Sequence, residues 1–443
     1  MKIVICGFGS AGYAASMSVK RAEPKTEIIV IDPKESDLMH PCGLPYALEG
    51  IVNPEDLLQN INLERGGITR LQGKVTGILT DSRKVLYKTD SGSLTESYDS
   101  LIATTGFRAI IPAIPGVDKL LGKSLFTLTD LPDLKRLLLA SEGVSTCVVI
   151  GGGAIGIEAS YALHKLGKRV TIVEMHDQFL KGVIDPDLSL ITENHLISEG
   201  ISVKKNSAVT AFEENGKLHK VICNTGTIES EMTILATGFA PDITIAENSD
   251  IEFNKSGITT DSFLRTSAKN VFAAGDCIAS WSSIDGKPLS SRLATSAYKQ
   301  GTIAGINALG GRTEYRGTAS TFVTRAGNFE LAGTGFNTET AIQRGFEPLS
   351  GKITSKIRPE YYPDNADITV KIIFDKNSGL ILGAQCCGLE GAASRINIIS
   401  MAVEFGITID ELWRTELAYC PSVSEVYDPL LRAADIGLRR LKR

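Results

Sequence analysis

Two parts of the chain share one pattern of apolar and polar positions. In each part, a short and mainly apolar run ends in a glycine-rich turn, a helical stretch follows, and a second apolar run ends in a carboxylate. These parts are residues 2–32 and 146–174. Apolar runs that are separated by a helical stretch are typical of parallel strands buried on both faces. The pattern therefore predicts two strand-helix-strand units in an α/β fold.

The two turns share the glycine spacing G-x-G-x-x-G. The glycines are Gly7, Gly9 and Gly12 in the first unit and Gly151, Gly153 and Gly156 in the second. Such a turn lets the backbone approach a pyrophosphate at the start of the helix, and an acid at the end of the second strand binds the ribose. The acids here are Asp32 and Glu174. Two dinucleotide sites are expected, and a tight turn without a ligand is the alternative.

Glu174 also bears on which nicotinamide dinucleotide binds. A carboxylate at this position accepts hydrogen bonds from both ribose hydroxyls and repels a 2′-phosphate. The residues that follow it, MHDQF, contain no arginine to receive such a phosphate. The sequence therefore favours NADH, with NADPH as the alternative.

Each unit continues in the same way. Short alternating segments punctuated by turns occupy residues 73–104 and 201–237. The units then end on the runs LIATTG and TILATG, which finish at Gly106 and Gly238. A repeat of this size is larger than the period of a solenoid. We therefore expect two copies of one nucleotide-binding domain.

The rest of the chain, after Gly238, carries two further signals. In TSAKNVFAAGDCIA, Gly275 and Asp276 end a strand of small residues, and a helix is expected to start there. A carboxylate at this point accepts hydrogen bonds from a polyol, or it caps the helix. From about residue 320, the runs ITVKIIFD and LILGAQCC predict antiparallel strands, and residues 392–405 predict an amphipathic helix.

Composition excludes several classes of partner. The formal net charge is -5 with both signs interleaved, so no basic run is available to bind nucleic acid. No apolar run reaches the roughly 18 residues of a membrane span, and the apolar start of the chain is too short for a signal peptide. We therefore expect a cytoplasmic protein with no nucleic-acid partner and no membrane partner.

One cysteine differs from the others in its surroundings. The 8 cysteines lack the spacing of a metal site or a disulfide framework, so we expect no metal and mostly reduced core thiols. Cys42 instead lies between Pro41 and Pro45 in MHPCGLPY, two residues after His40. The prolines restrict the backbone, and a helix N-terminus or a nearby imidazole favours a thiolate. A positioned reactive thiol is predicted at Cys42, with a buried structural cysteine as the alternative.

The two glycine turns, the Gly275-Asp276 motif and the CGLPY segment together resemble the pyridine nucleotide-disulfide oxidoreductases. Within this family they resemble the single-cysteine branch of NADH oxidases, NADH peroxidases and coenzyme A disulfide or persulfide reductases. The resemblance implies an α/β fold with two Rossmann-like dinucleotide-binding domains, for FAD and NAD, and a C-terminal α+β dimerisation domain. The implied boundaries are 1–110 with 248–320 for FAD, 111–247 for NAD, and 321–443 for the C-terminal domain.

The resemblance also implies roles for individual residues in a homodimer with a shared active site. Cys42 is the redox cysteine, and Tyr361 and Tyr419 of the partner subunit serve beside it as acid or hydrogen-bond donor. Ordinary interface packing is the alternative for each tyrosine. The implied cofactor-binding residues are Gly7, Gly9, Ser10, Ala11, Gly12, Asp32, Pro33, Lys34, Val75, Thr104, Thr105, Gly106, Gly151, Gly153, Ile155, Gly156, Glu158, Glu174, Gly238, Gly275, Asp276, Ala294 and Thr295.

The reaction that the resemblance implies passes electrons from NADH through FAD to Cys42. The next cysteine in the chain is Cys147, so Cys42 is expected to react with an external partner. Coenzyme A disulfide, a persulfide or oxygen is favoured. The alternatives are peroxide, a small redox protein with Cys42 incidental to turnover, and a flavin-binding interaction protein. Coenzyme A is a possible substrate or bound ligand. Lys20 and Arg21 lie on the first predicted helix, but Val19 stands where coenzyme A disulfide reductases tend to carry arginine for the nucleotide phosphate.

Overall fold

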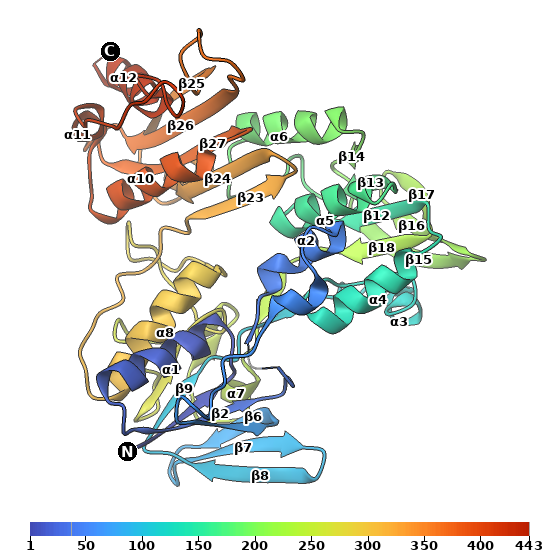
Figure 1. The fold of residues 1–443 in the computed structure, drawn as a ribbon, viewed down its shortest axis with the longest axis vertical. Coiled ribbons are helices and arrows are strands. Elements are labelled where there is room, and N and C mark those ends of the chain that lie inside the picture. The colour runs from blue at the N-terminus through green and yellow to red at the C-terminus, as the bar shows by residue number, and fades with distance from the viewer. Residues whose placement is uncertain (37, 443) are drawn as a thin grey trace. The chain divides into compact units, whose positions relative to one another are not determined.

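The structure is a computed structural model that describes residues 1–36 and 38–442 (Figure 1). The chain forms two compact units, and each unit combines segments that are distant in the sequence. The first unit consists of Met1–Pro41, Glu55–Ile110 and Phe239–Thr318, and the second consists of Cys42–Pro54, Ile111–Gly238 and Ala319–Arg443.

A parallel sheet with the strand order β22-β9-β1-β2-β5 forms the centre of the first unit. Its strands are β1 (Lys2–Cys6), β2 (Glu27–Asp32), β5 (Ile68–Gln72), β9 (Ser100–Ala103) and β22 (Val271–Ala273). Beside it lies an antiparallel sheet of β6 (Lys74–Leu79), β7 (Lys84–Thr89) and β8 (Gly92–Ser97). The apolar runs are buried strands of the parallel sheet, as the sequence pattern predicts.

Helices α1 (Ser10–Ala22) and α8 (Ala294–Ala308) lie side by side in this unit (Figure 1). Two glycines on α8 permit the close approach. A Cβ atom at Gly301 would lie 2.1 Å from the carbonyl oxygen of Ala11, and one at Gly305 would lie 2.1 Å from Ser18 Oγ. Helix α8 therefore packs directly against α1, from its first turn at Ala11 to Ser18.

The same arrangement recurs in the second unit. A parallel sheet has the order β11-β18-β12-β13-β14. Its strands are β11 (Leu125–Phe126), β12 (Thr146–Ile150), β13 (Arg169–Val173), β14 (Ser202–Lys204) and β18 (Met232–Leu235). Helix α5 (Ala154–Lys165) follows β12, and β15 (Val209–Asn215), β16 (Leu218–Cys223) and β17 (Gly226–Ser230) form an antiparallel sheet. The predicted duplication is confirmed.

The C-terminal part of the second unit is an antiparallel sheet with the order β23-β24-β27-β26-β25. Its strands are β23 (Phe322–Ala326), β24 (Phe329–Gly335), β25 (Pro348–Lys356), β26 (Asp367–Asp375) and β27 (Ile381–Gly388). Helices α10 (Ala392–Glu404) and α12 (Pro429–Leu441) pack on it. The predicted strands and helix are confirmed, and all residues of β27 are buried, including Cys386 and Cys387.

A cluster of charges joins helix α6 (Pro186–Ser198) to this antiparallel sheet. Lys371 Nζ on β26 lies 2.7 Å from Asp185 Oδ2 and 3.0 Å from Asp187 Oδ1. Lys352 Nζ on β25 lies 2.8 Å from Asp187 Oδ2. Asp185 is buried, so its charge is stabilised by the Lys371 ammonium and by hydrogen bonds from the backbone N–H and hydroxyl of Thr338. These contacts hold helix α6 and the antiparallel sheet together within the second unit.

The remaining elements are short and connect the sheets. They are β3 (Leu38–Met39), α2 (Leu44–Glu49), β4 (Leu58–Gln59), β10 (Phe107–Ala109), α3 (Val117–Leu120), α4 (Leu131–Ser141), β19 (Phe239–Pro241), α7 (Thr244–Glu247), β20 (Phe253–Asn254), β21 (Gly257–Ile258), α9 (Thr338–Gln343) and α11 (Ile409–Trp413). Two 3-10 turns cover Pro41–Gly43 and Pro54–Leu57. Among the described residues, none of the helices has both the length and the apolar character needed to cross a bilayer.

We predict that Gly301→Val destabilises the first unit, because the new side chain would overlap the backbone of α1. The expected loss is roughly 2 kcal/mol or more in the free energy of unfolding, as for other overpacked contacts. Denaturant titration of the purified protein measures it. Thr302→Val, which places the same side chain one residue further along α8 with almost no change in volume, serves as the control. Equal stability of the two variants would contradict the packing role of Gly301.

Candidate active site

The first glycine turn joins β1 to α1 and packs against the end of β9. Gly7 has a φ of +102°, and a Cβ atom there would lie 2.3 Å from the Thr104 carbonyl oxygen. A Cβ atom at Gly12 would lie 2.2 Å from the Gly7 carbonyl oxygen. At Gly9, by contrast, no atom of the described residues lies within 4 Å of the Cβ position. The chain itself requires Gly7 and Gly12, whereas Gly9 leaves open space beside the turn for a ligand.

The second turn repeats this geometry between β12 and α5. Gly151 has a φ of +112°, and its Cβ atom would lie 2.3 Å from the Ala236 carbonyl oxygen. A Cβ atom at Gly156 would lie 1.9 Å from the Gly151 carbonyl oxygen, while Gly153 again has open space around it. Ala236 is a residue that the sequence motif does not mark. Its carbonyl oxygen packs against Gly151 in the way that the Thr104 carbonyl oxygen packs against Gly7 in the first copy.

The two acids also occupy equivalent places. Asp32 Oδ2 accepts a hydrogen bond from the Phe8 backbone N–H at 2.5 Å and one from Lys34 Nζ at 2.7 Å. Glu174 Oε2 accepts one from the Gly152 N–H at 2.7 Å. In both copies, therefore, the acid holds the residue after the first glycine of the turn.

The same acids fix the segment that follows the second strand. Asp32 Oδ1 accepts a hydrogen bond from the Lys34 backbone N–H at 2.8 Å, and Glu174 Oε1 accepts one from His176 at 2.7 Å. Carboxylate oxygens have further lone pairs, so these contacts leave each acid able to accept hydrogen bonds from ribose hydroxyls.

Both turns fit the pyrophosphate of a dinucleotide. Gly9 and Gly153 are the N-cap residues of α1 and α5, and neither helix has a side-chain cap. The first N–H groups of each helix therefore face the open space beside these glycines, which is the arrangement that binds phosphate. Ser10 and Ala11 supply such groups in α1, and Ile155 lies in the first turn of α5.

The residues that close each copy are engaged in local packing. Thr104 Oγ1 donates a hydrogen bond to the Gly7 carbonyl oxygen at 2.8 Å, and Thr105 Oγ1 donates one to the Asp242 carbonyl oxygen at 2.6 Å. The following glycines, Gly106 and Gly238, have φ values of +74° and +94°. Each closing run therefore needs glycine for a left-handed turn. Pro33 and Lys34 follow β2, and Val75 lies on β6.

The expectation that a helix starts at the Gly275-Asp276 motif is wrong. No helix begins there: β22 ends at Ala273, the motif forms a turn, and α8 begins only at Ala294. The turn is positioned by tertiary contacts, because the Gly275 N–H donates a hydrogen bond to Gln300 Oε1 at 2.8 Å. The sequence pattern missed this because small residues are also common in tight turns.

The turn that carries Asp276 lies close to the first glycine turn. A Cβ atom at Gly275 would lie 3.0 Å from Ala11 Cβ, so the motif lies against the start of α1. Burial raises the pKa of Asp276 to about 6, and the Arg292 guanidinium opposes this shift. Arg292, which the sequence analysis did not identify, is itself half-buried. Ala294 and Thr295 begin α8 at exposed positions.

Cys42 is exposed, in the 3-10 turn Pro41–Gly43 that precedes α2. The helix expected at the cysteine begins two residues later, at Leu44, and ends at Glu49. Leu44 and Pro45 are buried, so they anchor the turn while leaving the thiol accessible. The alternative of a buried structural cysteine is wrong. The other cysteines are buried except for Cys420.

Two basic residues considered in the sequence analysis have local partners. His40 Nε2 lies 3.1 Å from Gln59 Oε1. Lys20 Nζ donates hydrogen bonds to the carbonyl oxygens of Pro24 and Thr26, at 3.3 Å and 2.8 Å. Lys20 thus stabilises the connection between α1 and β2. Val19 is fully buried in the core.

Glu158 of the second glycine motif shares a cavity of about 230 Å³ with Tyr46 of the CGLPY segment. Burial raises the pKa of Glu158 to about 7, although hydrogen bonds from Thr324 and from the Arg325 backbone oppose the shift. Thr324 and Arg325 lie on β23 of the C-terminal sheet. The sequence gives no signal for this contact, because the participating segments are far apart in the chain.

The structure brings Tyr361 and Tyr419 together. Their hydroxyl oxygens are 3.4 Å apart, and the two side chains are 73% and 45% exposed. The hydrogen bond to Tyr361 raises the pKa of Tyr419 to about 12. Cys420 follows this pair in the chain, and hydrogen bonds with Ser422 lower the pKa of its thiol. The tyrosine pair is therefore a proton-bearing site open to solvent.

We predict that Gly153→Ala and Gly156→Ala both weaken dinucleotide binding, for different reasons. The methyl group at residue 153 enters the open ligand space, whereas the one at residue 156 overlaps the turn itself. Only Gly156→Ala is expected to lower the melting temperature. Binding is measured by titration calorimetry with NADH and stability by thermal unfolding. Normal binding by Gly153→Ala would contradict the assignment of the open space to the ligand.

Comparisons with known proteins agree with this geometry. Residues 1–301 match the pyridine nucleotide-disulphide oxidoreductase family, and residues 321–430 match the dimerisation domain of that family. The chain is 30% identical over 455 residues to a protein named NADH oxidase from Methanocaldococcus jannaschii, with 100% of this chain and 99% of the relative covered. It is also 30% identical over 442 residues to the NAD(P)H coenzyme A polysulfide/persulfide reductase of Pyrococcus horikoshii, with 98% of each covered.

A solved structure extends the likeness to the fold. The NAD-dependent persulfide reductase from A. fulgidus has a TM-score of 0.95 and 28% sequence identity to this chain, and the match covers 100% of this chain and 84% of that one. The family, the α/β fold and the class of enzyme predicted from the sequence are all confirmed. This chain belongs to the pyridine nucleotide-disulphide oxidoreductase family.

Proposed function

We propose that the protein is an FAD-dependent NAD(P)H oxidoreductase in which Cys42 is the redox-active thiol. Its proposed electron acceptor is coenzyme A disulfide, a related persulfide, or oxygen. The observation that carries this proposal is the exposed Cys42 on a turn anchored by the buried residues Leu44 and Pro45. The relatives named NADH oxidase and coenzyme A polysulfide/persulfide reductase support the two kinds of acceptor.

The first glycine turn, Asp32 and Asp276 are the proposed FAD-binding groups. The second glycine turn and Glu174 are the proposed NADH-binding groups. Glu158, a further proposed cofactor-binding residue, lies on helix α5, which begins at the second glycine turn. When bound, FAD would accept a hydride from NADH and return two electrons to the oxidised form of Cys42. The chain supplies the backbone N–H groups, the carboxylates and the fixed position of the thiol.

The chemistry at Cys42 is a thiol-disulfide exchange when the acceptor contains a sulfur-sulfur bond. The Cys42 thiolate attacks one sulfur, a new sulfur-sulfur bond forms, and the original one breaks to release a thiolate. Tyr361 or Tyr419 is the proposed donor of the proton that this leaving thiolate takes up. Their hydroxyl oxygens are 3.4 Å apart, so the two phenols present their protons at one place.

A homodimer with a shared active site is part of the proposal. The match of residues 321–430 to a dimerisation domain supports association of two copies. Tyr361 and Tyr419 of the partner subunit would then complete the site at Cys42. We also propose domain boundaries at 1–110 with 248–320, 111–247 and 321–443, which separate the two glycine turns and the antiparallel sheet.

We predict that anaerobic titration with NADH produces a long-wavelength charge-transfer band between the Cys42 thiolate and the flavin. Cys42→Ser should lose the band while the flavin is still reduced, because only the sulfur donor is removed. Absorption spectroscopy measures both signals. Cys420→Ser, which changes the other exposed cysteine, is the matched control and should keep the band. Full flavin reduction without a band in the wild type would contradict the thiol mechanism.

The electron acceptor is identified by steady-state assays with coenzyme A disulfide, a coenzyme A persulfide, peroxide and oxygen. We expect kcat/KM for the physiological acceptor to fall by about 100-fold or more in Cys42→Ser, because a covalent step is lost. An acceptor whose reduction rate is unchanged in this variant reacts directly with the flavin.

We predict that the wild type prefers NADH to NADPH because Glu174 repels a 2′-phosphate. Glu174→Gln removes the charge and keeps most of the hydrogen-bonding geometry, so it should reduce the preference by roughly tenfold, about 1.4 kcal/mol. The ratio of kcat/KM for the two dinucleotides measures it. Asp177→Asn, which removes an exposed negative charge close in the sequence, is the control. An unchanged ratio in Glu174→Gln would contradict this assignment.

A further inference from the structure

The tyrosine pair is carried by two loops that are distant in the sequence. Tyr361 lies in residues 357–366, which connect β25 to β26. Tyr419 lies in residues 414–428, which connect α11 to α12. Neither loop has regular secondary structure, so the 3.4 Å separation of the two hydroxyl oxygens depends on whatever fixes the loops relative to each other.

The pair does not hold the loops in place by itself. Both phenols are substantially exposed, and water competes for an exposed hydrogen bond between neutral groups. A distance of 3.4 Å is also long for a hydrogen bond between two hydroxyl groups. A stronger contact is therefore needed between the loops.

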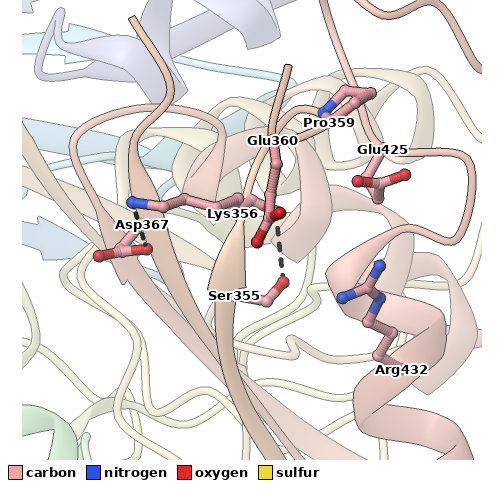
Figure 2. Close-up of a pocket in the computed structure, with 7 residues that line it drawn as sticks. All are labelled: Ser355, Lys356, Pro359, Glu360, Asp367, Glu425 and Arg432. Atoms are coloured by element: carbon pink, nitrogen blue, oxygen red, sulfur yellow. Dashed lines mark hydrogen bonds and ion pairs between the residues drawn. The ribbon is translucent and has the colours of Figure 1, made fainter. Parts of the chain in front are cut away.

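A polar hollow rather than an apolar core lies next to the two loops. It has a volume of about 540 Å³ and is lined by Pro359 and Glu360 from the first loop and Glu425 from the second. Figure 2 shows the carboxylate of Glu360 and that of Glu425 on separate segments around this hollow, with Arg432 of α12 below Glu425. Apart from Pro359, the lining residues are charged or polar, so apolar packing at the hollow does not explain the approach of the two loops.

Arg358 provides the contact between the loops. Its Nε donates a hydrogen bond to the Ser422 carbonyl oxygen in the second loop at 2.8 Å. Its Nη1 donates one to the Asp364 carbonyl oxygen in its own loop at 3.2 Å. The same side chain forms an ion pair with Glu390, which lies just before α10. One guanidinium therefore joins both loops to the body of the C-terminal sheet.

The position of Arg358 is itself fixed by its backbone. The Arg358 N–H donates to Asn365 Oδ1 at 3.0 Å, and Asn365 Nδ2 donates to the Arg358 carbonyl oxygen at 2.6 Å. This reciprocal pair closes the base of the first loop. Ser422, on the other side, is part of the turn that contains Cys420, since the Cys420 Sγ lies 3.3 Å from Ser422 Oγ. The guanidinium thus acts on the turn directly after Tyr419.

The chemistry of the contact requires arginine. A guanidinium presents several N–H donors in a rigid plane and keeps its charge at any physiological pH. It can therefore bind two carbonyl oxygens and a carboxylate at the same time. A lysine at this position would retain the charge but has a single donor atom, so it cannot bridge the same groups in one geometry.

We infer that Arg358, held by Glu390, is a positioning residue that sets the distance between Tyr361 and Tyr419. The inference rests on the proposed function, in which this pair donates the proton taken up by the leaving group. Arg358 does not contact the reacting atoms in this scheme. It acts by holding the turn after Tyr419 against the loop that carries Tyr361.

The test compares Arg358→Gln, Arg358→Lys and Glu390→Gln with the wild type. Arg414→Gln is the matched control, because Arg414 forms an exposed ion pair with Asp410 in the same domain. Reduction of the flavin by NADH and reoxidation by the acceptor are measured separately in a stopped-flow instrument. We expect reoxidation to slow by about tenfold in Arg358→Gln, with a smaller loss in the other two variants and an unchanged rate of flavin reduction.

The pH profile of reoxidation distinguishes positioning from a general loss of structure. Loss of the Tyr361 contact removes the hydrogen bond that stabilises the neutral phenol of Tyr419, so its pKa falls towards the ordinary value of about 10. The alkaline decline in rate should therefore move to lower pH in Arg358→Gln and stay in place in Arg414→Gln. An alkaline limb that does not move in Arg358→Gln would overturn the inference.

A double-mutant cycle with Tyr361→Phe gives the second measurement. If Arg358 acts through the pair, Arg358→Gln should add little to the loss already caused by Tyr361→Phe. Fully additive losses would mean that Arg358 acts elsewhere. Failure of the proposed function is recognised independently, because the wild type would then show no charge-transfer band. A wild-type band together with an unaffected Arg358→Gln variant contradicts only the positioning role.

Discussion

The structure depends on one close contact that occurs twice: a glycine turn packed against the carbonyl oxygen of a closing strand. At Gly7 and at Gly151, a Cβ atom would lie 2.3 Å from that oxygen. No side chain fits at such a distance, so each turn is held directly against the end of its sheet. The helix that follows is thereby aimed so that its first N–H groups face open space. The ability to bind a dinucleotide follows from this backbone constraint.

The two copies differ in the groups around this shared geometry. Asp32 is paired with Lys34, whereas Glu174 accepts hydrogen bonds from the backbone of Gly152 and His176. The first copy also receives the Gly275-Asp276 turn from a distant segment, which packs against Ala11. These additions give the copies different chemistry although their turns are nearly identical. They support the assignment of FAD to the first copy and NADH to the second.

The C-terminal part is organised by charged and polar contacts at its edges. Lys371 and Lys352 bind Asp185 and Asp187 beside α6. The Arg395 guanidinium binds the carboxylate of Asp428 at the start of α12, with both residues buried. Such contacts fix the loops at the edges of the sheet. The tyrosine pair is an example, because its loops border a polar hollow and meet through hydrogen bonds.

The sequence by itself determined the features that depend on neighbours along the chain. Periodicity identified the buried strands, the glycine spacing identified both turns, and the prolines around Cys42 indicated a restricted thiol. Through its resemblance to a family, it also indicated Tyr361 and Tyr419 as site residues. These signals are local because burial and backbone conformation leave a direct trace in residue type.

Only the tertiary structure decided what depends on distant segments. It placed Asp276 in a turn held by Gln300 rather than at a helix start, and it joined Glu158 to Thr324. It also brought the hydroxyl groups of Tyr361 and Tyr419 within 3.4 Å and placed Arg358 between their loops. Residue type alone does not encode these contacts, because each requires two segments to be positioned by the packing of separate elements.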